Sequence, residues 1–141
     1  MKDKTNIKPV LVIPCSGIGK VHGLLSREAT YLVTDEIEPE KTKTMCLALL
    51  VKGEPEAIEA VQTQPCITID GCPKMCAEKN VKIVGGKPVA VEVVEILKKH
   101  PGAKPGSPTD LNDEGWNIAR EIAAKVADTA ANVYGGREGV Q

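Results

Sequence analysis

Cysteine is the residue in this chain whose chemistry stands out first. The 141 residues hold five cysteines but only two histidines. Four of them, Cys15, Cys46, Cys72 and Cys76, fall after predicted strands or at predicted helix starts, whereas Cys66 lies inside a predicted strand. In a reducing compartment, cysteines are more often metal ligands, reactive thiols or core residues than disulfide partners. The cysteines therefore predict metal or thiol chemistry, with Cys66 as a core residue.

The spacing of Cys72 and Cys76 favours a shared site. The two are four residues apart around an expected helix start, with Pro73 in the first turn. Residues at this spacing share a helix face, and a helix N-terminus favours the thiolate that binds metal. With Cys15 and Cys46 they would form a four-cysteine set suited to Zn²⁺. An iron–sulfur cluster takes the same ligands, and a thiol-redox enzyme using Cys72 and Cys76 is a further alternative.

Four polar residues near these cysteines are candidates for positions beside the metal: Ser16, Lys20, His22 and Asp70. His22 could be an alternative ligand or a proton donor, although a partly exposed helix residue is the commoner case. Asp70 could orient a ligand or act as a base, although an aspartate here more often bonds the following turn. No residue can be assigned a catalytic role from spacing alone, so the sequence does not decide whether the protein is an enzyme.

The segment Gly17-Ile18-Gly19-Lys20 has some features of a phosphate-binding loop. A Walker A loop requires Ser or Thr after the lysine, where this chain has Val21, so we exclude nucleotide hydrolysis. Two alternatives remain for the loop. It could hold an anion on its backbone N–H groups, or it could be a glycine turn that lets the chain pass near the metal site.

Alternating strands and helices are predicted to position these residues. Short apolar runs over 10–13 and 66–69 indicate buried parallel strands, and alternating valines indicate another over 89–93. Helices are expected over 20–35, 45–51, 55–64, 74–80 and 94–99, with a loop over 36–44 and a strand over 81–84. This order predicts an α/β fold with a mostly parallel sheet and flanking helices, a Rossmann-like three-layer arrangement. Because sites gather at the carboxyl ends of parallel strands, Cys15 and Cys72 should share that edge.

A long C-terminal helix is the most regular predicted element. Ser107 is expected to cap it, with Pro108 in the first position and Asp110 as the capping-box acid. Its apolar stripe runs through Leu111, Gly115, Ile118, Ile122, Val126, Thr129 and Val133. We therefore predict a single domain over residues 9–134, with short flexible tails at 1–8 and 135–141.

Composition narrows the function classes. The net charge is −1, and two Tyr, one Trp and no Phe leave little for base stacking, so we expect no nucleic-acid partner. No apolar run approaches a membrane span and the N-terminus does not resemble a signal peptide, so we expect a cytoplasmic protein without a membrane partner. A chain of this length buries about 68–70% of its unfolded surface, so the thiols are not needed merely for folding. The oligomeric state is not predicted.

The segment Ile69-Asp70-Gly71-Cys72-Pro73, followed by Cys76-Ala77, resembles the DGC-domain family, which is named for the Asp-Gly-Cys triplet. Cys15-Ser16-Gly17 and Cys46-Leu47 are similar to the other two cysteine positions of that family, so the resemblance covers roughly residues 10–80. It implies a cytoplasmic protein of bacterial or archaeal type. It also implies that four cysteines hold zinc. With all four sulfurs engaged the site would be closed, and a closed site predicts a structural, storage or sensing role. Cys66 lies outside the four positions.

Overall fold

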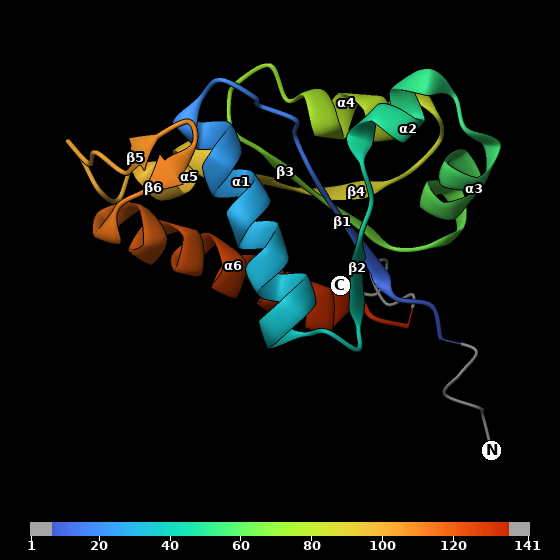
Figure 1. Cartoon of the computed structure of the whole chain (residues 1–141). Coiled ribbons are helices and arrows are strands. Elements are labelled where there is room, and N and C mark those ends of the chain that lie inside the picture. Colours follow the sequence, from blue (N-terminus) through green and yellow to red (C-terminus); the bar gives the residue numbers. More distant parts are fainter. Residues whose placement is uncertain (1–6, 136–141) are drawn as a thin grey trace.

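A four-stranded parallel sheet forms the centre of the computed structural model, which describes residues 7–135. The strand order is β2-β1-β3-β4, with β1 at Val10–Pro14, β2 at Thr42–Thr44, β3 at Cys66–Asp70 and β4 at Pro88–Glu92 (Figure 1). Val10 lies opposite Thr42 on one side, and Val12 lies opposite Ile67 on the other. The apolar runs of β1 and β3 are continuous because helices cover both faces of the sheet.

Helices form a layer on each side of the sheet (Figure 1). One layer holds α1 (Val21–Tyr31), its π-helical continuation η2 (Leu32–Ile37), α5 (Val93–Leu97) and α6 (Asp113–Val133). The other holds α2 (Leu47–Lys52), α3 (Pro55–Thr63) and α4 (Cys76–Ile83). A short antiparallel ribbon, β5 (Gly106–Ser107) with β6 (Asp110–Leu111), precedes α6. The predicted α/β class, three layers and long C-terminal helix are confirmed.

Two hydrophobic cores fill the space between the layers. Along β1, Val10 and Val12 face the core beneath α1 and α6, whereas Leu11 and Ile13 face the core beneath α2, α3 and α4. These four side chains are at most 3% exposed. The alternation follows from the two-residue period of a strand, which sends successive side chains to opposite faces. Both faces of the central strand are therefore fixed by packing.

The chain segments that follow β1 and β3 lead toward opposite edges of the sheet. The chain leaving β1 runs through α1 to β2, whereas the chain leaving β3 runs through α4 to β4 on the opposite side of the sheet. In open α/β sheets, this switch in direction leaves a crevice at the carboxyl ends of the two strands, where ligands commonly bind. The fold thus brings the segments after β1 and β3 together.

The segment over 36–44 differs from its prediction as a loop. It contains the end of η2 and the edge strand β2. The sequence of this strand is Thr-Lys-Thr, without an apolar run. It is recognisable only from its backbone pairing with β1, so the sequence pattern did not predict it. The predicted strand over 81–84 is also wrong, since α4 extends to Ile83. Ala77 and Val81 are four residues apart and both buried, which is typical of a helix. The apolar residues at 81, 83 and 84 led to the prediction of a strand instead.

The start of the last helix also differs from its prediction. Ser107 and Asp110 belong to the β5–β6 ribbon rather than to a helix cap. Helix α6 begins at Asp113, where the Asn112 side chain accepts a hydrogen bond of 2.8 Å from the Gly115 N–H. Asn112 is a favourable capping residue, and it satisfies a backbone donor of the first turn. The apolar stripe of the helix is buried as predicted, at Ile118, Ile122, Val126 and Val133 among others.

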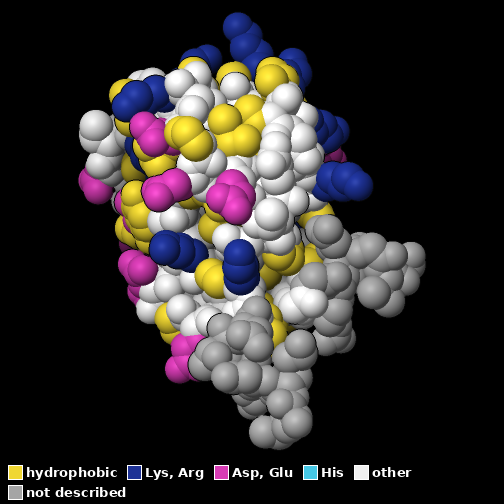
Figure 2. All heavy atoms as spheres, turned by 90° about the vertical axis from the view of Figure 1, so that its right-hand side faces the viewer, with side chains coloured by type: hydrophobic (Ala, Val, Ile, Leu, Met, Phe, Trp, Pro, Cys, Tyr) yellow, Lys and Arg dark blue, Asp and Glu magenta, His cyan; other side chains and the backbone are white. Residues whose placement is uncertain are grey.

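Acidic and basic side chains are interspersed among apolar ones on the side of the molecule that carries α2 and α3 (Figure 2). Within the described part of the chain, no helix combines the length and the apolarity needed to cross a bilayer. The predicted flexible tails fall mostly on residues 1–6 and 136–141, which lie outside the described residues.

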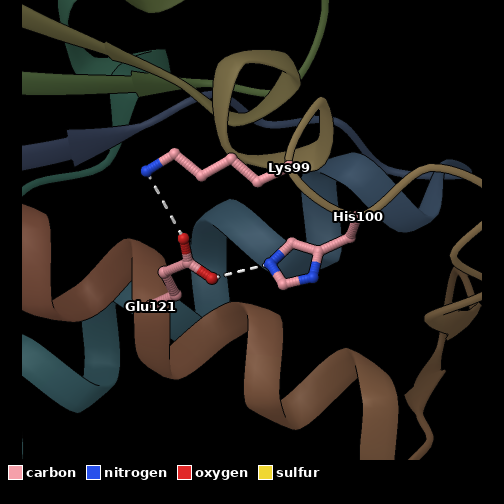
Figure 3. A network of polar contacts seen from close by, with 3 residues as sticks. All are labelled: Lys99, His100 and Glu121. Carbon is pink, nitrogen blue, oxygen red and sulfur yellow. Dashed lines mark hydrogen bonds and ion pairs between the residues drawn. The ribbon is translucent and has the colours of Figure 1, made fainter.

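A small polar network joins the turn after α5 to α6 (Figure 3). The Nε2 atom of His100 lies 2.7 Å from Oε1 of Glu121, and Nζ of Lys99 lies 3.6 Å from its Oε2. The hydrogen bond with His100, together with the nearby positive charge, holds the pKa of Glu121 below its ordinary value. A carboxyl with a lowered pKa stabilises the fold above its unfolded pKa, and this stabilisation is lost as the pH falls through its folded pKa.

We therefore expect Glu121→Gln to lower the free energy of unfolding at pH 7 by less than about 1 kcal/mol, since the pair is partly exposed. The difference from the parent should disappear as the pH falls below the ordinary carboxyl range, about 4. Urea denaturation from neutral to acidic pH measures both effects. Asp128→Asn, an exposed position of the same helix, is the control and should show no such loss. A Glu121→Gln difference that does not change with pH would contradict the assignment.

Candidate metal centre

Three cysteines follow three neighbouring strand ends. Cys15 comes one residue after β1, Cys46 two residues after β2, and Cys72 two residues after β3. Because these strands are parallel and adjacent in the order β2-β1-β3, their carboxyl ends lie along one edge. The predicted placement of Cys15 and Cys72 on this edge is confirmed. Cys46 joins them because the segment predicted as a loop contains β2.

Cys15 contacts the Asp-Gly-Cys turn directly. The Gly71 N–H donates a hydrogen bond of 3.3 Å to the Cys15 Sγ, across 56 positions of sequence. The Ser26 hydroxyl lies 3.4 Å from the same sulfur, on the facing side of α1. Cys15 is 8% exposed and Ser26 is fully buried. The carboxyl ends of β1 and β3 are thus joined through a sulfur atom.

Asp70 ties the end of β3 to the beginning of α4. Its carboxylate accepts hydrogen bonds from the N–H groups of Ala77, at 2.8 Å, and Glu78, at 3.1 Å. Burial raises the pKa of Asp70 above its ordinary value, although the two N–H donors act in the opposite direction. These bonds satisfy donors of the first helical turn that would otherwise lack partners. Asp70 therefore fixes the position of Cys76, the first residue of α4.

The prediction that Cys72 and Cys76 share a helix face is wrong. Helix α4 begins at Cys76, so Pro73 lies in the turn before it rather than in its first turn. Met75 has φ of +54°, in the left-handed region, and separates the turn from the helix. The helix starts later than predicted because Asp70 caps it from the preceding strand. Cys76 keeps a place at the helix N-terminus, whereas Cys72 lies in the turn.

Gly71 leaves room for the first helix to pass. A Cβ added at this position would lie 2.8 Å from the backbone oxygen of His22, which is closer than such contacts allow. The Gly71 carbonyl also lies 3.1 Å from Nδ1 of His22. Each member of the triplet thus has a distinct structural task. Asp70 caps α4, Gly71 packs against α1, and Cys72 follows at the strand-end edge.

The sequence that forms this arrangement matches a known protein family. The family model described as the DGC domain matches residues 11–114. The chain belongs to the DGC-domain family. The matched range contains the triplet Asp70-Gly71-Cys72 and also Cys15, Cys46 and Cys76. No curated protein and no solved structure matches the chain.

The glycine loop of this DGC domain lies against α1. Gly17 has φ of +47°, and a Cβ added to Gly23 would lie 2.2 Å from the Gly17 carbonyl oxygen. Two glycines therefore allow the loop after β1 to touch the helix backbone. This contact agrees with the interpretation of the loop as a close passage of the chain beside the site. Lys20, at the N-cap position of α1, is exposed and makes no side-chain capping bond.

Sequence reasoning did not identify three residues that support this edge of the DGC domain. These are Gly23 and Ser26 on α1, already described, and Arg27, whose Nη1 donates a hydrogen bond to the backbone carbonyl of Ser16. A glycine inside a helix costs about 1 kcal/mol relative to alanine, so Gly23 was a usable signal for a close backbone contact. Ser26 and Arg27 carry no comparable local signal, since their contacts with Cys15 and Ser16 join α1 to a distant part of the chain.

The five thiols differ in exposure. Cys46 and Cys76 are exposed, Cys72 is partly buried, and Cys15 is buried. Cys66 lies at the start of β3, away from the carboxyl edge, and is 1% exposed in the core, as predicted. Among residues 7–135, no three His, Cys, Asp or Glu side chains are grouped closely enough to hold a metal ion. The fold thus gives the four candidate cysteines a common edge, without a formed tetrahedron of sulfurs.

Proposed function

We propose that this DGC domain binds one zinc ion through the thiolates of Cys15, Cys46, Cys72 and Cys76. The observation that supports the proposal most strongly is the delivery of one cysteine by each of three adjacent strand ends. Zn²⁺ favours sulfur ligands in tetrahedral, closed structural sites. With four sulfurs engaged, the ion would have no open position, which suits a structural, storage or sensing role. A reducing cytoplasm would keep the thiols available.

The surroundings of the sulfurs suit this role. The Gly71 N–H donor at Cys15 is the kind of outer partner that orients metal ligands. Asp70 anchors the first turn of α4, which fixes the backbone position from which the Cys76 sulfur projects. Cys46 and Cys76 are exposed, so their side chains have room to change rotamer and turn toward Cys15. Metal capture, in this proposal, draws the sulfurs together along the strand-end edge.

Metal analysis of anaerobically purified protein, with its visible absorption spectrum, tests the proposal. One zinc per chain in a colourless protein is the expected result. A brown protein containing iron and acid-labile sulfide would replace zinc with an iron–sulfur cluster on the same four ligands. A metal-free protein in which Cys72 reacts fastest with an alkylating reagent would instead favour a thiol-redox enzyme using Cys72 and Cys76.

Serine substitution of one ligand identifies the site. Loss of a residue that only hydrogen-bonds to a metal ligand typically weakens metal binding by roughly 10–100-fold. We expect Cys72→Ser, which removes a ligand itself, to weaken zinc binding by more than this. Competition with a coloured chelator measures this change. Cys66→Ala is the matched control, because this thiol lies in the core and not at the carboxyl edge. Loss of zinc from a folded Cys66→Ala protein, judged by circular dichroism, would refute the four-ligand assignment.

A further inference from the structure

A cavity of about 360 Å³ lies at the carboxyl ends of β1 and β2, and we call it the β1–β2 pocket. Its wall includes Cys15 and Cys46, which are two of the proposed zinc ligands. The pocket therefore borders the proposed metal site. Its other walls come from the loop after β1, the outer part of α1 and the segment between β2 and α2. The volume is in the range of pockets that hold small molecules.

Much of the pocket wall is apolar, and part of that surface is in contact with water. Ile18 is 80% exposed and Tyr31 is 47% exposed, while Met45 and Leu47 line the inner side. An apolar ligand in the cavity would cover the exposed side chain of Ile18, and the removal of apolar surface from water is favourable. The wall therefore suits a ligand with a hydrocarbon body.

Arg27 is the one charged residue in this wall. Its Nη1 donates to the Ser16 carbonyl, which holds the guanidinium beside the loop. An arginine has five N–H donors, and the Nε–Nη2 edge has the geometry that binds a carboxylate with two hydrogen bonds. Among residues 7–135, no carboxylate is paired with Arg27. A cationic group without an acidic partner thus stands in an otherwise uncharged wall.

We propose that the β1–β2 pocket binds a small carboxylate with a hydrocarbon tail. The carboxylate pairs with Arg27, and the tail lies against Ile18, Tyr31 and Met45. This assignment does not depend on metal binding. A zinc ion held by four thiolates carries a net negative charge beside the pocket, so we expect the carboxylate to bind more weakly to the zinc-loaded protein than to the metal-free protein. The pocket gives the domain a small-molecule ligand in addition to the proposed metal.

Titration of the full chain with hexanoate, followed by amide chemical shifts in NMR spectra, tests this site. Hexanol is the uncharged match, and both are added to chelator-treated and zinc-loaded protein. We expect hexanoate to shift the signals of 15–18 and 44–47, with hexanol at least about tenfold weaker, because a hydrogen bond to a charged group is lost. Arg27→Gln should weaken hexanoate binding about tenfold or more. Arg120→Gln, the same substitution at an exposed position of α6 outside the pocket wall, should leave hexanoate binding unchanged.

Ile18→Ala gives a second test that does not depend on the arginine. Ile18 is largely exposed, so its loss should not unfold the protein, but it should reduce the preference for hexanoate over acetate, because Tyr31 and Met45 still contact the tail. Equal binding of hexanol, or no effect of Arg27→Gln, would overturn the proposal. Hexanoate binding by a protein that takes up no zinc would overturn only the metal proposal. Zinc binding without hexanoate binding in either form of the protein would overturn only the carboxylate site.

Discussion

Replacement of Gly23 by alanine should lower the free energy of unfolding by about 1–3 kcal/mol, the typical range of overpacked interiors. In an ordinary helix interior the same change stabilises by up to about 1 kcal/mol, so the expected effect has the opposite sign. The reason is the close contact with the loop after β1. The new Cβ would lie 2.2 Å from the Gly17 oxygen and 2.5 Å from the Gly17 Cα, which are both backbone atoms. Urea denaturation measures the change.

The added methyl group of Gly23→Ala should displace Gly17 and the loop after β1. This displacement should also move Cys15, which lies two residues before Gly17. A shift of this loop alters the contact of the Cys15 sulfur with the Gly71 N–H, so zinc affinity should fall about 10–100-fold, as for other outer partners. Gly19→Ala is the control. Its added Cβ meets nothing within 4 Å, so only the cost of φ at +94° remains, about 1 kcal/mol. A Gly23→Ala protein as stable as its parent would show that the loop can move away freely.

The sequence predicted β1 and β3 correctly because packing defines them, and it predicted β4 from the alternation of its valines. β1 and β3 read as continuous apolar runs, because each buries side chains against helices on both faces. β2 was missed because it is only three residues long and has no apolar residues, whereas β4, at the other sheet edge, has alternating valines. Its existence depends on backbone pairing with β1, which leaves no pattern in the side chains. This omission also hid the position of Cys46 next to a strand end.

Two predicted helix starts failed for a common reason. Pro73 and Pro108 both follow residues that resemble caps, and local pattern places them in the first helical turn. In the structure both prolines lie in turns, and the helices begin later, where Asp70 and Asn112 supply the hydrogen bonds. Asp70 lies seven residues before Ala77, beyond the span of a local capping motif. Tertiary placement of β3, rather than local sequence, sets the start of α4.

Asp70→Ala is the other substitution for which we expect a large effect, a loss of about 2–4 kcal/mol in the free energy of unfolding. The change would leave the N–H groups of Ala77 and Glu78 without their acceptor at a largely buried helix start. Each unsatisfied buried donor costs about 1–3 kcal/mol, and partial access of water to Glu78 keeps the sum below the upper limit. Chemical denaturation of the metal-free protein measures this loss without any contribution from zinc.

Asp70→Asn separates the hydrogen bonds from the other properties of the residue. Ala77 and Glu78 donate to different oxygens of Asp70, and asparagine replaces one of these oxygens with an NH₂ group that cannot accept. The stability of Asp70→Asn should therefore lie between those of the parent and Asp70→Ala. If Asp70 fixes Cys76 for metal binding, zinc affinity should fall in the same order. Equal stability of all three proteins would contradict the capping role. A graded loss of stability with unchanged zinc affinity would confirm the cap and separate it from the metal site, because the position of Cys76 would then not limit binding.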